Sequence, residues 1–159
     1  MGKYIRNLSP GFTLVEVITV IALLGIVLAV AVPSINSTLN EMKLDSAAQE
    51  VVSAIHYVRS LAIKEGVVYG VKFTAGANKF NCYKTGSIIN PFDKKPYVVD
   101  FDTEGHLQGV DIVSASFSAG KLTFDSIGEA SESGTVLLEY AGLQKTITVS
   151  APIGRVTVN

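Results

Sequence analysis

An almost uncharged apolar run near the N-terminus is the feature that most constrains this chain. The run extends from Phe12 to Val32, and Glu16 is its only charged residue. A helix of this length is about 30 Å long at about 1.5 Å per residue, which is roughly the thickness of a bilayer's hydrocarbon core. Pro33 closes the run and predicts that a continuing helix is kinked or interrupted there. We therefore expect an apolar helix that needs an apolar surrounding.

Basic residues lie before the apolar run and not directly after it. Lys3 and Arg6 precede it, and the next basic residue is Lys43. This asymmetry predicts a single membrane crossing, with the N-terminus in the cytoplasm and the C-terminal part outside it.

Two simpler interpretations of the run stay open at this point. A secretory signal would end in a cleavage site of small residues, and Ala29-Val30-Ala31 has that pattern. A plain membrane anchor would need nothing beyond apolar residues. Neither interpretation accounts for Glu16, because a carboxylate isolated in lipid is strongly unfavourable. No Lys, Arg or His follows within helical reach of Glu16, so its partner has to come from elsewhere.

The N-terminal segment resembles that of type IV pilins and pseudopilins. The resemblance rests on the short basic leader, the sequence GFTLVE at residues 11–16 and the apolar helix that follows. It implies that a prepilin peptidase cuts between Gly11 and Phe12 and methylates the new amino group of Phe12. It also implies that Glu16 pairs with the Phe12 amino group of a neighbouring subunit, since matched buried charges cost far less than isolated ones. Apolar helices packed together would then form the core of a filament.

After Pro33 the pattern becomes that of an amphipathic helix. Apolar residues recur at spacings of three and four, namely Leu44, Ala48, Val51, Ile55, Val58 and Ala62. Gly66 is a typical C-terminal stop, so we expect the helix to end at about residue 65.

From Val67 onward the apolar pattern has a period of two, which indicates β-strands. Strands are expected at 67–73, 79–84, 97–101, 110–113, 121–124, 136–140, 143–149 and 155–158, with tight turns at 75–78 and 141–142 and a loop at 87–96. We thus predict an α+β fold, in which a long N-terminal α-helix packs on an antiparallel, sandwich-like β domain. The predicted organisation is a cleaved leader (1–11), an apolar helix (12–33), an amphipathic helix (34–66) and a β-rich domain (67–159).

The tail of the chain resembles the C-terminal domain of the H-type minor pseudopilins of type II secretion, which FimT-like minor pilins share. The segments that carry this resemblance are 124–128, 134–138, 141–142 and 153–156. It implies a structural subunit near the filament tip or at the start of assembly. Its partners would be other pilins or pseudopilins, the prepilin peptidase, the membrane and the inner-membrane assembly platform.

A minor pilin of a type IV pilus, with a role in pilus assembly or DNA uptake, is the alternative function. FimT-like proteins that bind DNA resemble one another in a basic cluster after a Gly-Arg pair. Gly154-Arg155 is present here, but residues 156–159 add no second basic residue. Lys3 and Arg6 account for two of the 13 basic residues, so 11 remain in the rest of the chain against 14 acidic ones. This balance argues against nucleic-acid binding, for which Arg155 is the one candidate contact.

Other chemistry has weaker support in the sequence. His56 and His106 belong to no catalytic motif, so we expect a non-enzymatic protein without a cofactor, and a membrane-tethered enzyme stays as a third class. The single cysteine, Cys82, excludes an intramolecular disulfide.

An acidic segment resembles part of a calcium-binding loop. Asp100, Asp102, Glu104, Gly105 and Asp111 occupy positions one, three, five, six and twelve of an EF-hand-like pattern. The residues at positions five and twelve depart from that pattern, and β-rich segments flank it. We interpret the segment as a solvated β-turn and assign no metal.

Overall fold

The computed structural model describes residues 11–84, 88–90 and 94–159, except for the side chains of residues 30–34. By its internal contacts the chain divides into two units, which meet between Thr38 and Leu39. The leader with Lys3 and Arg6 lies outside the described residues, as do parts of the predicted 87–96 loop.

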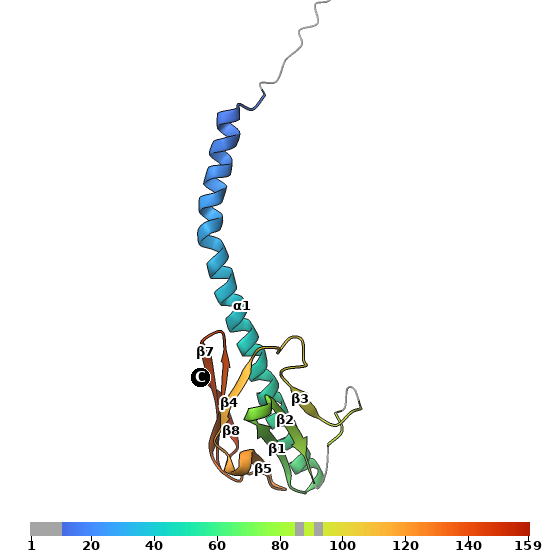
Figure 1. Ribbon diagram of the computed structural model, residues 1–159. Coiled ribbons are helices and arrows are strands. Elements are labelled where there is room, and N and C mark those ends of the chain that lie inside the picture. The colour runs from blue at the N-terminus through green and yellow to red at the C-terminus, as the bar shows by residue number, and fades with distance from the viewer. Residues whose placement is uncertain (1–10, 85–87, 91–93) are drawn as a thin grey trace, which may run out of the picture. The chain divides into compact units, whose positions relative to one another are not determined.

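A single helix, α1, extends from Leu14 to Glu65 and contributes residues to both units (Figure 1). It ends where Gly66 adopts a left-handed φ of 68°, as the sequence predicted. The helix continues through Pro33, so the expectation that it could be interrupted there is wrong. Proline removes one backbone hydrogen bond, and the long helical segments on both sides tolerate that loss.

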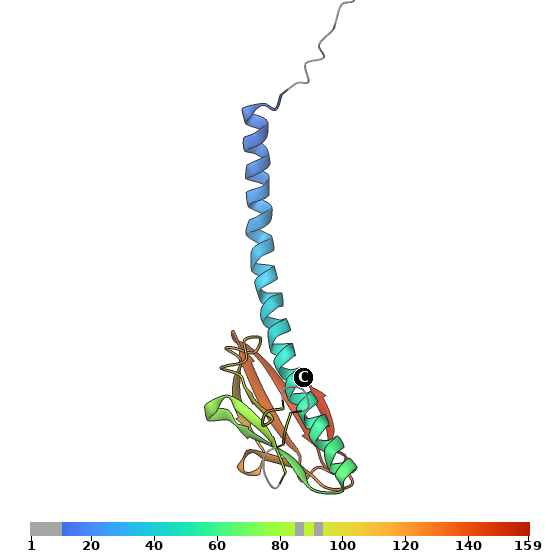
Figure 2. The ribbon, with the colours of Figure 1, turned by 90° about the vertical axis from the view of Figure 1, so that its right-hand side faces the viewer.

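The strands of the second unit form two antiparallel sheets (Figures 1 and 2). One sheet has the order β3-β2-β1-β5 and the other the order β4-β6-β7-β8. The strands are β1 (Tyr69–Thr74), β2 (Lys79–Tyr83), β3 (Val98–Asp100), β4 (Asp111–Ala115), β5 (Lys121–Phe124), β6 (Gly134–Tyr140), β7 (Leu143–Ser150) and β8 (Arg155–Val158). Two short 3-10 turns connect strands: η1 (Ala75–Ala77) lies between β1 and β2, and η2 (Ser118–Gly120) lies between β4 and β5.

The predicted α+β architecture is confirmed, and each predicted strand has a counterpart. The clearest difference concerns the start of the first strand, which was expected at Val67 and is found at Tyr69. Val67 and Val68 are 37% and 57% exposed, so their apolar character does not reflect pairing in the sheet. Val67 and Val68 form the short connection between the left-handed turn at Gly66 and the start of β1.

The core lies between the two sheets and the second part of α1. The predicted apolar stripe of α1, from Leu44 to Ala62, is at most 1% exposed at every position. Phe80, Phe101 and Phe124 are fully buried against it. Each such side chain contributes about 1.5–3 kcal/mol through burial.

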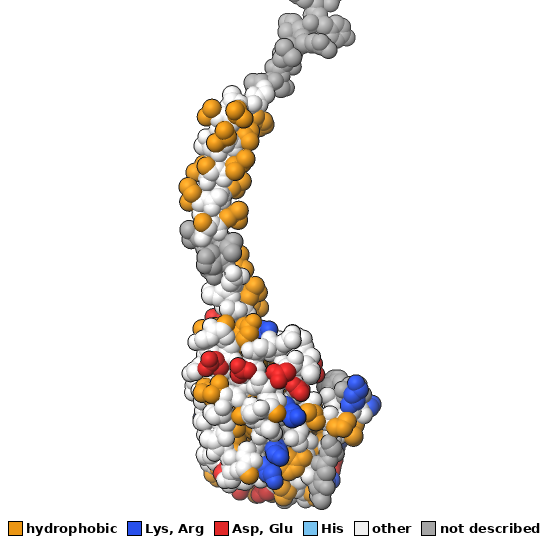
Figure 3. All heavy atoms as spheres, in the orientation of Figure 1, with side chains coloured by type: hydrophobic (Ala, Val, Ile, Leu, Met, Phe, Trp, Pro, Cys, Tyr) orange, Lys and Arg blue, Asp and Glu red, His pale blue; other side chains and the backbone are white. Residues whose placement is uncertain are grey.

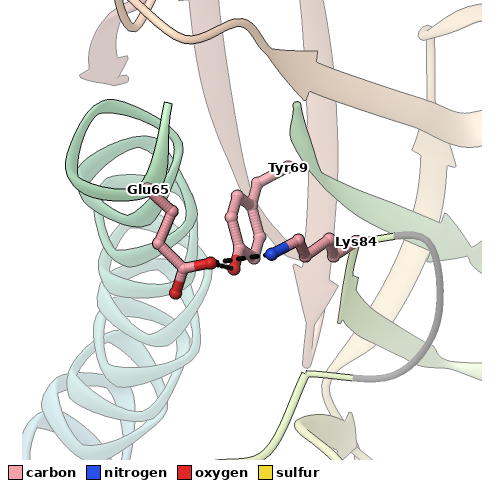
Figure 4. A network of polar contacts seen from close by, with 3 residues as sticks. All are labelled: Glu65, Tyr69 and Lys84. Atoms are coloured by element: carbon pink, nitrogen blue, oxygen red, sulfur yellow. Dashed lines mark hydrogen bonds and ion pairs between the residues drawn. The ribbon is translucent and has the colours of Figure 1, made fainter. Parts of the chain in front are cut away.

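Polar contacts attach both sheets to the helix. Lys145 of β7 forms an ion pair with Asp45 of α1. At the other sheet, the Glu65 carboxylate accepts hydrogen bonds from the Tyr69 hydroxyl at 2.5 Å and from the Lys84 ammonium at 2.8 Å (Figure 4). The pKa of Glu65 is lowered, mainly by the hydrogen bond from Lys84. The pKa of Tyr69 is raised, mainly by burial.

Candidate functional site at the start of the helix

The predicted cleavage site lies immediately before α1. Gly11 and Phe12 are in an irregular segment, and the Phe12 side chain is 83% exposed. No atom lies within 4 Å of the position that a Cβ on Gly11 would occupy. The Gly11–Phe12 bond is therefore outside the hydrogen-bonded part of the helix and has free space around it.

Thr13 and Glu16 form a reciprocal cap at the helix start. The Glu16 backbone N–H donates to the Thr13 hydroxyl at 3.2 Å, and the Thr13 N–H donates to the Glu16 carboxylate at 3.4 Å. This capping box satisfies backbone donors that have no partner within the helix. It engages one carboxylate oxygen of Glu16 weakly, so the charge remains available to an external cation.

Glu16 also borders a shallow apolar hollow. The hollow measures about 310 Å³ and is lined by Phe12, Glu16, Val17, Val20 and Ile21. The side chains of Glu16 and Phe12 thus share one side of the segment.

The N-terminal part of α1 is apolar on all sides and exposed (orange in Figure 3). Twelve large hydrophobic residues between 12 and 28 are at least 45% exposed: Phe12, Leu14, Val15, Val17, Ile18, Val20, Ile21, Leu23, Leu24, Ile26, Val27 and Leu28. A helix without a polar face requires burial in lipid or among other helices. No helix is long and apolar enough to span a membrane within the described residues, which exclude the side chains of 30–34.

Arg155, the candidate nucleic-acid contact, is exposed at the start of β8. The sequence did not indicate that a second arginine lies nearby. Arg59 of α1 donates to the Gly128 carbonyl oxygen at 3.0 Å, and its Cζ is 3.6 Å from the position of a Cβ on Gly154. Arg59 thus holds the β5–β6 connection through a neutral carbonyl, so its guanidinium keeps its positive charge near Gly154.

The two histidines belong to the second unit. His56 is exposed on α1, and His106 borders an open hollow of about 570 Å³ together with Met42, Asp45, Ser46, Gln49, Glu50 and Ser53. Serine and carboxylate groups therefore lie near His106, as a hydrolase would require. However, no hydrogen bond joins His106 to them within the described part of the chain, so this hollow lacks a formed nucleophile–base pair.

The acidic segment between β3 and β4 forms a turn, as we interpreted it. The Asp100 carboxylate accepts the Asp102 backbone N–H at 3.0 Å, and the Asn78 amide donates to Asp102 and Asp111. Among residues 11–84, 88–90 and 94–159, no three acidic, histidine or cysteine side chains are placed to hold a metal ion.

Cys82 lies in the core as a free thiol. Burial raises the pKa of its thiol to about 12, so almost none of it is thiolate at neutral pH. This environment is typical of a structural cysteine.

Two family models match the chain. The model described as type II transport protein GspH matches residues 47–152, and that of the prokaryotic N-terminal methylation motif matches residues 6–32. Both regions coincide with features described above, since the first contains the core and the second contains the capping box and the exposed apolar helix. The chain shows no significant match to curated protein sequences.

Solved structures of other proteins share the fold, among them a minor pseudopilin and a minor pilin. The minor pseudopilin EpsH from the type 2 secretion system of Vibrio cholerae is 16% identical, with a TM-score of 0.58, and the match covers 74% of this chain and 96% of that one. The type IV minor pilin FimU of Pseudomonas aeruginosa is 18% identical, with a TM-score of 0.55, and the match covers 75% of this chain and 90% of that one. At these identities the likeness concerns the fold alone.

Proposed function

Because the chain belongs to the GspH family of type II transport proteins, we propose that it is a minor pseudopilin, a structural subunit of the pilus-like filament of type II protein secretion. The family match over residues 47–152 is the observation that carries this proposal. In this role the β-rich unit is the globular part of the subunit and the apolar helix is its assembly part.

The proposed maturation begins with cleavage by the prepilin peptidase between Gly11 and Phe12. The exposed, non-helical position of this bond and the matched methylation motif support the step. Cleavage makes Phe12 the first residue and leaves its amino group next to the start of α1, where methylation follows.

The proposed assembly step pairs Glu16 with the Phe12 amino group of a neighbouring subunit. The hollow beside Glu16 is apolar, so a neighbouring helix that fills it excludes water from the carboxylate. A carboxylate enclosed in this way needs a positive partner, and an N-terminal amino group is the one that each new subunit brings.

Before assembly, we propose, the subunit waits in the inner membrane with its N-terminus in the cytoplasm and its β-rich unit outside. The exposed hydrophobic surface from Phe12 to Leu28 supports this, because lipid is the apolar surrounding available to a single subunit. The basic residues Lys3 and Arg6 of the leader set the orientation. The assembly platform in the same membrane would then move the subunit into the filament.

A minor pilin of a type IV pilus is the second candidate. The TM-scores of 0.55 with FimU and 0.58 with EpsH are nearly equal, so the fold does not separate the two functions. The surplus of acidic residues after the leader and the lone terminal Arg155 favour secretion over a DNA-binding pilus.

Deletion of the gene in its host separates these functions. A minor pseudopilin predicts loss of secreted proteins from the medium with normal surface pili, and plasmid-borne wild-type protein should restore secretion. Loss of pili with normal secretion would instead establish the second candidate. A plasmid carrying Arg155→Ala tests the DNA role, since unchanged DNA uptake would exclude that contact.

A further inference from the structure

Three hydrogen-bond donors form a row across the outer face of the β3-β2-β1-β5 sheet. Lys121 of β5 lies opposite Lys72 of β1, and Lys72 lies opposite Asn81 of β2. The residues next to them along the strands, Leu122, Val71 and Cys82, face the core and are fully buried. The three donors therefore project together from the outer face, at strand spacings of about 4.8 Å.

The pairing of Lys72 with Lys121 places two positive charges directly opposite each other. Like charges in this position destabilise an antiparallel pair. Within the described residues, neither ammonium group has an ion pair or a hydrogen bond that would offset the repulsion. The sheet would gain stability from an anion held between them.

Tyr83 and Gly70 shape the surface beside this row. A Cβ on Gly70 would lie 2.7 Å from Cζ and 2.8 Å from the hydroxyl oxygen of Tyr83, so the ring lies directly over the glycine. Only a residue without a side chain permits this position. The Tyr83 hydroxyl is thereby brought over β1, two residues along the strand from Lys72.

These residues line an open hollow in which every side chain offers a hydrogen-bond donor. It measures about 270 Å³ and is lined by Lys72, Asn81, Tyr83, Lys84 and Lys121. Each lining side chain carries an N–H or O–H group, and none is acidic. In Figure 3 blue side chains lie over the region where Figure 1 labels β1, β2 and β5, and further blue side chains lie toward the edge beyond β3 and near α1.

The charge of the hollow indicates which anion fits it. Lys84 is paired with Glu65 at 2.8 Å, so the uncompensated charge comes from Lys72 and Lys121. A phosphate monoester carries a charge of about −1.5 to −2 at neutral pH, whereas a carboxylate or a phosphodiester carries one negative charge. We propose that this hollow binds a phosphate group that carries close to two negative charges, either as inorganic phosphate or as the monoester group of a phosphorylated sugar.

The binding test uses the full-length protein in a non-ionic detergent. Backbone amide NMR shifts of β1, β2 and β5 are followed during titration with methyl phosphate, dimethyl phosphate and acetate at constant ionic strength. Saturable shifts with methyl phosphate, and much weaker ones with the two monovalent anions, are the expected result. Equal responses to all three probes would show general ion attraction and overturn the proposal.

Variants then locate the site. Lys72→Gln and Lys121→Gln should each weaken methyl phosphate binding about tenfold, since each removes one charged hydrogen bond. Lys79→Gln is the matched control, because Lys79 is on the same face but lies opposite Asp100 and outside the hollow. An equal loss of methyl phosphate affinity in Lys72→Gln, Lys121→Gln and Lys79→Gln would show that the hollow is not the binding site.

The melting temperature in phosphate-free buffer provides an independent test of the repulsion between Lys72 and Lys121. Lys121→Gln should raise the melting temperature in phosphate-free buffer, because it removes the opposed charges, and should abolish the further rise that methyl phosphate produces in the wild type. A lower melting temperature in phosphate-free buffer would contradict the repulsion on which the proposal rests.

Titration with inorganic phosphate and with glucose 1-phosphate distinguishes the two sources of the phosphate group. Equal affinity indicates recognition of phosphate alone, and tighter glucose 1-phosphate binding indicates sugar contacts as well.

Discussion

The side-chain amide of Asn78 donates a hydrogen bond to the Asp111 carboxylate at 2.6 Å. The same amide donates to Asp102 at 3.2 Å, and the Asn78 side-chain oxygen accepts the Ile112 N–H at 2.8 Å. Asn78 follows β1 and η1 in one sheet, whereas Asp111 and Ile112 begin β4 in the other. A single residue in the first hairpin thus connects the two sheets.

Replacement of Asn78 should therefore be costly. Asn78→Ala removes three side-chain hydrogen bonds and places alanine at a left-handed φ of 45°, so we expect a loss of about 2 kcal/mol in the free energy of unfolding. Urea unfolding measures this loss. Gln108→Ala, in the exposed turn between β3 and β4, is the control and should change stability little. If Asn78→Ala lowers the free energy of unfolding no more than Gln108→Ala does, the connection between the sheets is dispensable.

The contact between Glu65 and Lys84 predicts a pH dependence of stability. The pKa of Glu65 is lowered from 4.5, first by the hydrogen bond from Lys84 and next by that from Tyr69. A carboxylate with a lowered pKa in the folded state stabilises the protein above its unfolded pKa, and this contribution is lost as the pH falls through the folded value. Glu65→Gln should therefore lower the melting temperature more at pH 7 than at pH 3.

Thermal unfolding of wild type and Glu65→Gln at both pH values measures this difference. Glu104→Gln, in an exposed turn, serves as the control for general charge effects and should show a smaller dependence on pH. An equal effect of Glu65→Gln at pH 3 and pH 7 would mean that its ionised carboxylate does not stabilise the fold.

Local patterns in the sequence were sufficient for the architecture but not for the contacts between distant segments. The spacing of Leu44 to Ala62 predicted the buried face of α1, because a helical period follows directly from neighbouring residues. The pairing of Lys72 with Lys121 depends on strand register across a long connection, which the period does not determine. The role of Asn78 likewise required the position of β4, so the sequence indicated only a turn there.

The candidate residues at positions 11–16 were predicted from a different kind of pattern. Glu16 was a candidate because a carboxylate is unusual in an apolar helix, whereas Gly11 and Phe12 were candidates through the resemblance to type IV pilins. The capping contact between Thr13 and Glu16 also has a sequence signal that the sequence analysis did not use, a threonine followed three residues later by glutamate.

Burial of Cys82 predicts that its thiol is unreactive in the native protein. With a pKa of about 12, the thiolate fraction at pH 8 is about one in ten thousand, and the side chain has no access to solvent. Alkylation with a maleimide or iodoacetamide should therefore be very slow in buffer and rapid in concentrated urea. Rapid labelling in buffer at the rate found in urea would contradict the buried position of Cys82.

Processing at Gly11 should depend on the size of the residue there. Gly11→Leu should block the peptidase, so the protein keeps its leader and runs as the longer precursor, whereas Gly11→Ala should retain at least part of the processing. Mass spectrometry of the membrane fraction distinguishes the two forms and detects methylation of Phe12. A normally shortened Gly11→Leu protein would count against the proposed cleavage site.

Glu16→Gln tests the central proposal most directly. Glutamine can keep the capping bond to the Thr13 N–H and removes only the charge, so helix formation and membrane insertion should remain as in the wild type. The measurement is the amount of the protein in sheared filaments relative to the membrane fraction, with Thr13→Ala as the control for loss of the cap. We predict a several-fold lower filament fraction for Glu16→Gln and a near-normal fraction for Thr13→Ala. A wild-type filament fraction for Glu16→Gln would show that the Glu16 charge does not join neighbouring subunits.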